Sequence, residues 1–166
     1  SLGMSAGQAF IKAAEVPVAH KAALIVITAS GGARMQESSF ALMQMPRTVL
    51  AIQDVKRAKL PYIVILSDPT SGGVLASYAM LGDVQIAEPG AQLAFTGPRV
   101  IEATIREKLP EGFQRWEFLP ERGMGDIVCA RKELTATVGA VLGMLMPASR
   151  GRRSKAVASE DVAAAK

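Results

Sequence analysis

The hydrophobic and polar positions along the chain alternate between short apolar runs and longer segments with helical spacing. Two runs, residues 23–28 and 62–66, are apolar at nearly every position and rich in β-branched residues. Such runs are typical of strands buried on both faces of a parallel sheet. Shorter runs predict further strands over residues 84–87, 92–95 and 126–130.

The segments between these runs carry apolar residues three and four positions apart, which predicts helices. We expect a helix within residues 1–16, capped by Ser5, and others over residues 35–59, 74–81, 100–108, 116–121 and 132–146. Because proline lacks an amide donor and collides with the preceding turn, Pro46 predicts a break near Met45. Alternating strands and helices predict an α/β fold with right-handed crossovers.

Composition limits the class of protein. The chain has 166 residues, of which 49% are hydrophobic and 20% charged, as in one globular domain with a buried core. No apolar run approaches the ~18 residues needed to cross a membrane. The single cysteine, Cys129, excludes an intramolecular disulfide and a cysteine-built zinc site, and favours a reducing, cytoplasmic location. No metal site is expected in this chain, and the single histidine, His20, is expected in a surface loop.

The positive charge is uneven. The net charge is +4, and the stretch "SRGRRSK" at residues 149–155 carries four of the 19 basic residues. We expect residues 1–146 to form the domain and residues 147–166 to be a basic, disordered tail, either solvated or acting as an anion-binding arm. Because no aromatic residue interleaves there to stack on bases, nucleic-acid binding is disfavoured.

Candidate chemistry lies where the two main strands end. The first is followed by Gly31–Gly32 and the second by Gly72–Gly73. Ligands of open α/β sheets bind at the carboxyl ends of strands, and glycine lets a ligand approach the main-chain N–H groups closely. A helix beginning after each pair would also leave its first N–H groups without internal acceptors.

Known anion-binding motifs that are missing from these turns limit the kind of anion that they could bind. Neither turn matches the phosphate loop or the dinucleotide fingerprint. Two short sets of N–H donors are better suited to single oxyanions, as in enolate chemistry. The alternative is that the glycines only make tight turns. Two nearby carboxylates are expected to be structural: Asp68 organising its loop through an Asx-type bond, and Asp83 capping the turn into the third strand.

A family resemblance rests on long strings rather than on the glycines alone. The segment "SYAMLGDVQIAEPGAQLAFTGPRVIEATIREKLPEGFQRWEFLPERG", with the two Ser-Gly-Gly turns before it, resembles the carboxyltransferase β subunit of bacterial acetyl-CoA carboxylase. The resemblance extends from Ser1 to about Ile127. It implies an α/β fold of the crotonase-like (ClpP/crotonase) type, a superhelix of ββα units that is incomplete in this chain.

The resemblance also implies a reaction. A carboxyl group passes from carboxybiotin, on a biotin carboxyl carrier protein, to acetyl-CoA, giving malonyl-CoA. One oxyanion site serves the ureido oxygen of biotin and another the thioester oxygen. The implied partners are a carboxyltransferase α subunit and the carrier protein, in an α2β2 hetero-oligomer.

Two sets of site residues follow from the resemblance. The expected oxyanion donors are Gly72, Gly73, Gly31 and Gly32. The expected substrate contacts are Ala33, Arg34, Gly97 and Arg99. For Arg34, an ion pair with Glu37 is the alternative to a contact with a CoA phosphate.

The chain also departs from the family pattern. The family's β subunit begins with a four-cysteine zinc ribbon and early strands, and both are missing here. We therefore expect a fragment, or a chain completed by partners, with doubtful activity alone. Two alternatives remain: another biotin-dependent acyl-CoA or malonyl carboxyltransferase subunit, and a non-catalytic assembly or nucleic-acid-binding subunit that uses the basic tail.

Overall fold

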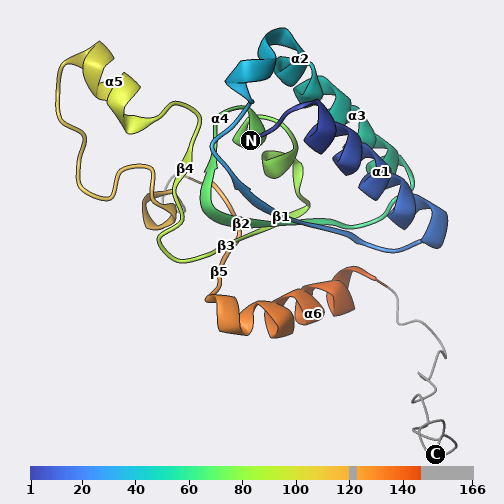
Figure 1. Ribbon diagram of the computed structural model, residues 1–166. Coiled ribbons are helices and arrows are strands. Elements are labelled where there is room, and N and C mark those ends of the chain that lie inside the picture. Colours follow the sequence, from blue (N-terminus) through green and yellow to red (C-terminus); the bar gives the residue numbers. More distant parts are fainter. Residues whose placement is uncertain (120–122, 147–166) are drawn as a thin grey trace, which may run out of the picture.

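In the computed structural model, which describes residues 1–119 and 123–146, parallel strands form one sheet with helices on both faces (Figure 1). The strand order is β1-β2-β3-β5, and β4 pairs with the last residues of β2. The strands are β1 (Leu24–Ser30), β2 (Tyr62–Ser71), β3 (Val84–Ala87), β4 (Leu93–Ala94) and β5 (Ile127–Val128). The predicted strands are therefore present, with β2 extending five residues further than expected.

Strand β2 lies at the centre of the sheet, and this position accounts for its apolar sequence. Its side chains alternate between the two faces of the sheet. Tyr62, Val64 and Leu66 are buried in one core cluster, and Ile63 and Ile65 in another. Because both faces are covered, nearly every position of the strand must be apolar, as the sequence predicted.

Helices supply the two covering layers. On one face lie α1 (Met4–His20) and α3 (Gln44–Arg57), and on the other lies α6 (Leu134–Leu145). The remaining helices are short. They are η1 (Met35–Glu37), α2 (Ser38–Leu42), α4 (Gly72–Leu75), η2 (Tyr78–Leu81), α5 (Pro98–Ile105), η3 (Trp116–Phe118) and η5 (Arg131–Glu133).

Helix α1 differs from its prediction at both ends. Ser5 is not its cap: the N-cap residue is Gly3, and the Met4 N–H donates to Glu37 Oε2 at 2.6 Å. A carboxylate distant in sequence thus satisfies an N–H that a local cap would otherwise serve. The helix also continues through Pro17, so the exposed His20 is its last residue rather than a loop residue.

The predicted break near Met45 is confirmed as two helices separated at Met43. Helix α2 ends at Leu42 and α3 begins at Gln44, so Pro46 is the third residue of α3. An amide in the first turn of a helix has no acceptor within that helix, and proline therefore costs no hydrogen bond there. The helix predicted over residues 74–81 is divided into α4 and η2.

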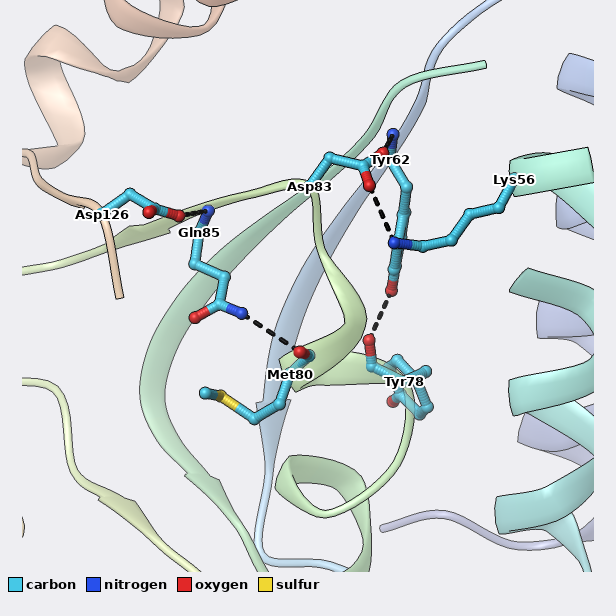
Figure 2. Close-up of polar contacts among 7 residues, drawn as sticks. All are labelled: Lys56, Tyr62, Tyr78, Met80, Asp83, Gln85 and Asp126. Carbon is cyan, nitrogen blue, oxygen red and sulfur yellow. Dashed lines mark hydrogen bonds and ion pairs between the residues drawn. The ribbon is translucent and has the colours of Figure 1, made fainter. Parts of the chain in front are cut away.

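Side-chain carboxylates serve the end of the sheet where β2 and β3 begin, which we call the amino edge (Figure 2). Asp83 accepts the Tyr62 N–H at 2.9 Å and the Lys56 ammonium at 2.7 Å. Asp126 accepts the Gln85 N–H at 2.8 Å. Asp83 therefore supports the start of β2 rather than merely capping the turn into β3.

Tyr62 adds a further contact at the amino edge. Its hydroxyl donates to the Tyr78 carbonyl at 2.8 Å (Figure 2). Burial raises the pKa of the Tyr62 hydroxyl well above its usual value. The hydroxyl therefore stays protonated and remains a donor through the neutral and mildly alkaline range.

Candidate functional site

The two glycine pairs meet at the opposite end of the sheet, where β1 and β2 end, which we call the carboxyl edge. A Cβ at Gly32 would lie 3.2 Å from Gly72 Cα, and a Cβ at Gly72 would lie 3.2 Å from Gly32 Cα. Both residues also have positive φ, +115° and +56°. The two turns therefore touch backbone to backbone, an arrangement that a side chain on either residue would prevent.

The second turn presents N–H groups that its own helix does not use. Helix α4 begins at Gly72, and the first bond of the turn runs from the Ala76 N–H to the Gly72 carbonyl at 3.0 Å. The N–H groups of Gly72 and Gly73 therefore have no acceptor within α4. Both glycines are half-buried. Because α4 is a single turn, it contributes individual N–H groups rather than a helix dipole.

The first turn is built differently, and the prediction that a helix opens directly after it is wrong. The Gly32 N–H donates to Ser30 Oγ at 3.2 Å, while the Gly32 carbonyl accepts the Leu2 N–H at 2.8 Å. The Arg34 N–H in turn donates to the Leu2 carbonyl at 2.8 Å. This bridge keeps the chain extended until η1 begins at Met35.

The glycines of the first turn differ in exposure. Gly32 is buried, whereas Gly31 is exposed, and a Cβ at Gly31 would meet no atom within 4 Å. Ala33 is half-buried, and its Cβ would lie 3.5 Å from a Cβ at Gly73. Of the predicted residues, the structure thus brings the four glycines and Ala33 together.

Of the other predicted substrate contacts, Arg34 directly follows the first turn, whereas Gly97 and Arg99 lie at the start of α5. Arg34 forms the ion pair with Glu37 that was its alternative role, at 3.5 Å. Gly97 is the exposed N-cap residue of α5, which lies beyond β4 and away from α4 (Figure 1). Arg99 is the second residue of α5, and its side chain lies outside the described part of the structure.

The carboxylates of the carboxyl edge are occupied by long-range partners. Asp68 Oδ1 accepts the Gln92 N–H at 2.7 Å and lies 3.4 Å from Arg115 Nη1, rather than making the expected bond within its own loop. Glu88 binds Arg131 through both carboxylate oxygens, one of them at 2.7 Å. Hydrogen bonds from Arg131 and then Ser67 lower the pKa of Glu88 to about 2.

Sequence reasoning missed the hydroxyl groups that support the turns. Ser30, two residues before Gly32, accepts the Gly32 N–H, a bond that the Ser-Gly-Gly motif itself offers. Thr28 and Thr70 form a buried pair behind the turns. Nothing local in the sequence indicates that pair, because the two residues lie on different strands.

Within residues 1–119 and 123–146, no three or more His, Cys, Asp or Glu side chains gather to hold a metal ion. In the same part of the chain, no helix has the length and apolar character needed to span a membrane.

Comparison with protein families matches residues 1–113 to the carboxyl transferase domain. The chain is 68% identical over 152 residues to the acetyl-coenzyme A carboxylase carboxyl transferase subunit beta of Hyphomonas neptunium, covering 92% of this chain and 47% of that protein. It is 60% identical over 146 residues to the protein of that name from Bartonella quintana, covering 88% and 48%. The chain thus spans about half the length of the curated relatives it matches.

Solved structures share the fold. Transcarboxylase 12S superimposes with a TM-score of 0.75 at 24% identity, covering 86% of this chain and 28% of that one. A Pseudomonas malonate decarboxylase hetero-tetramer in complex with malonate gives 0.74 at 25% identity, covering 93% and 62%. An enoyl-CoA hydratase from Mycobacterium avium subsp. paratuberculosis gives 0.61 at 18% identity, covering 89% and 70%. The predicted crotonase-like α/β fold is confirmed.

Proposed function

The chain belongs to the carboxyl transferase domain family, and we propose that it forms the β-subunit side of the carboxyl-transfer site of an acetyl-CoA carboxylase. In this proposal a carboxyl group passes from carboxybiotin on a carrier protein to acetyl-CoA, giving malonyl-CoA. The names of relatives up to 68% identical support the assignment. The structural observation that carries it is the backbone contact between the two glycine turns at the carboxyl edge.

The chemistry requires stabilisation of a negative oxygen. The acetyl methyl carbon loses a proton and forms a bond to the carboxyl carbon, and charge develops on the thioester oxygen between these steps. We assign the Gly72 and Gly73 N–H groups as donors to such an oxyanion. Loss of one donor of this kind typically costs ~2.7–4 kcal/mol of transition-state stabilisation.

The first turn has a supporting role in the proposal. The Gly32 N–H is held by Ser30, so Gly32 contributes chiefly by letting the second turn approach. The exposed Gly31 and the adjacent Ala33 line the acyl-CoA side. We assign the ureido oxygen of biotin to the backbone N–H groups of these turns that Ser30 and Leu2 do not occupy. When bound, carboxybiotin would supply the carboxyl group by cleavage of its N–carboxyl bond, and the biotin nitrogen left behind would accept the proton from the methyl carbon.

The proposed assembly includes a carboxyltransferase α subunit and a biotin carboxyl carrier protein, in an α2β2 arrangement. The fold neighbours from Pseudomonas malonate decarboxylase were solved as a hetero-dimer and a hetero-tetramer. Because this chain spans about half of its relatives, we expect activity only in the full-length protein with its partner.

The test is carboxyl transfer by that full-length complex. Purified complex, acetyl-CoA and carboxylated carrier protein are combined, and malonyl-CoA is measured by mass spectrometry. Parallel reactions with propionyl-CoA, which would give methylmalonyl-CoA, distinguish other biotin-dependent acyl-CoA carboxyltransferases. Malonyl-CoA formation from acetyl-CoA that is faster than methylmalonyl-CoA formation from propionyl-CoA supports the proposal. A clear preference for another acceptor would overturn the substrate assignment.

A further inference from the structure

A buried pair of hydroxyl groups lies immediately behind the two glycine turns. Thr28 and Thr70 are 2% and 0% exposed. Their Oγ1 atoms lie 2.8 Å apart and join β1 to β2. Gly31 follows three residues after Thr28, and Gly72 follows two residues after Thr70. The pair is thus the last buried side-chain link between the strands before the turns.

The distances assign the two protons. Thr70 Oγ1 lies 2.8 Å from the Ser67 carbonyl and 3.1 Å from the Thr28 carbonyl. Thr28 Oγ1 lies 2.8 Å from Thr70 Oγ1 but 3.3 Å from the Ile65 carbonyl. Each hydroxyl has one proton, so the shortest arrangement has Thr28 donating to Thr70, and Thr70 donating to the Ser67 carbonyl.

These hydrogen bonds span an irregularity in the pairing of β1 with β2. Thr28 pairs with Leu66, but Ser30 pairs with Thr70, so β2 uses four residues where β1 uses two. The two additional residues form a bulge between the regular ladder and the turns. Thr70 fixes this bulge, because its hydroxyl bonds back to Ser67 at the start of the bulge and across to Thr28 on β1.

We infer that Thr70 is a positioning residue for the proposed oxyanion site, setting the register in which Gly72–Gly73 faces Gly31–Gly32. Thr70 does not contact substrate in this inference, which rests on the proposed function. Its hydroxyl fixes how far β2 has advanced past β1 when the turn begins. The close Gly32–Gly72 contact leaves little tolerance for a change in that register.

The direction of these hydrogen bonds predicts unequal effects for substitutions of Thr70 and Thr28. In Thr70→Val the Ser67 carbonyl loses its hydroxyl donor, and Thr28 can turn to the Ile65 carbonyl. In Thr28→Val the bond from Thr70 to the Ser67 carbonyl remains. The Thr70 substitution should therefore disturb the turns more than the Thr28 substitution, although both remove one hydroxyl from the same buried site.

Four substitutions in the full-length protein, purified with its partner, test this. Thr70→Val should lower kcat for carboxyl transfer about 10- to 100-fold, because small misplacements of reacting groups carry losses of that order. The KM for acetyl-CoA should stay near the wild-type value. Thr28→Val should have a smaller effect, and Thr70→Ser should restore most of the activity. Thr48→Val is the matched control, since Thr48 is 0% exposed and its hydroxyl bonds to Met45 within α3.

Hydrogen–deuterium exchange on the same complexes gives a readout independent of activity. Thr70→Val should accelerate exchange in peptides covering residues 29–34 and 70–75, and Thr48→Val should not. Wild-type exchange in those peptides, or wild-type kcat in Thr70→Val, overturns the inference. If the unsubstituted complex transfers no carboxyl group, the proposed function fails instead, and exchange alone then decides whether Thr70 positions the turns.

Discussion

The two ends of the sheet use their backbone N–H groups in opposite ways. At the amino edge, carboxylates from Asp83 and Asp126 accept the N–H groups of Tyr62 and Gln85, so the starts of β2 and β3 are saturated (Figure 2). At the carboxyl edge, the turn after β2 begins a helix whose Gly72 and Gly73 N–H groups have no acceptor within it.

The difference shows how one sheet serves both stability and binding. At the amino edge, side-chain carboxylates take the place of water as acceptors for backbone N–H groups. At the carboxyl edge, two glycines without side chains let one turn lie against the next. We therefore expect substitutions at the carboxyl edge to change activity first, and substitutions at the amino edge to change stability first.

The largest effect is expected from Gly72→Ala. The new Cβ would lie 3.2 Å from Gly32 Cα and 3.3 Å from the Gly31 carbonyl oxygen, at a φ of +56° that alanine disfavours. The donors would move, and carboxyl transfer by the full-length complex should fall roughly 10²- to 10³-fold, as when an oxyanion-hole donor is lost. Steady-state kinetics measure the change, and circular dichroism establishes that the fold is intact.

The control for that substitution is Gly139→Ala on α6, because a Cβ at Gly139 meets no atom within 4 Å. It should change the transfer rate far less. Equal losses in the two variants would show that the loss in Gly72→Ala does not arise from the contact between the turns.

At the amino edge, Asp83→Ala should destabilise the protein without changing the kinetics of the complex. It leaves the Tyr62 N–H, at the start of a buried strand, without its carboxylate acceptor. An unpaired buried donor costs about 1–3 kcal/mol of unfolding free energy. Urea denaturation measures the loss, with Asp54→Ala, which removes an exposed ion pair with Arg57, as the control. A large fall in kcat would contradict the division between the two edges.

A smaller loss is expected from Tyr62→Phe. This change deletes the hydroxyl bond to the Tyr78 carbonyl and should cost about 1 kcal/mol. Because burial holds the pKa of Tyr62 well above its usual value, that contribution should not vary between pH 6 and 9, below the pKa at which the unfolded tyrosine ionises. Denaturation curves of both proteins at several pH values across that range test this. A difference that disappears within this range would mean that the folded hydroxyl ionises there.

The last effect concerns Glu88 and is confined to the acid range. Its pKa is lowered to about 2 in the folded protein, from an ordinary value of about 4.5, chiefly by Arg131. A lowered carboxyl pKa stabilises the fold above the unfolded value, and this stabilisation is lost as the pH falls from about 4.5 to about 2. Arg131→Met should therefore show a shallower acid dependence in pH-dependent denaturation, the two proteins converging near pH 2. Parallel curves would show that the ion pair does not contribute to the pH dependence of the unfolding free energy.

Much of the fold could be predicted from the sequence because its signals are local. Strand β2 is apolar throughout because it is central, and β3 has its predicted bounds of residues 84–87. The glycine pairs marked the carboxyl edge, since a parallel sheet places the ends of neighbouring strands together. The ion pair between Arg34 and Glu37 was also foreseen as an alternative, from their spacing alone.

The errors occur where distant segments decide the outcome. Ser5 is not a cap because Glu37, more than thirty residues away, serves the start of α1. Asp68 bonds to Gln92 and Arg115 rather than within its own loop. The first glycine turn is followed by extended chain because Leu2 bridges it. No periodicity or local motif contains these contacts, so the sequence indicated the two glycine turns but not the contacts that support them.

The bridge at Leu2 has a practical meaning for anyone who redesigns this protein. Residues 2–4 are joined to residues 32–37 by the Leu2 N–H and carbonyl and by the Met4 N–H. An insertion between residues 2 and 4 would lengthen one side of this double connection and break at least one bond, so that stretch is unsuited to tags or labels. The exposed Gly143 of α6, where a Cβ would meet nothing within 4 Å, is a better place for a fluorophore.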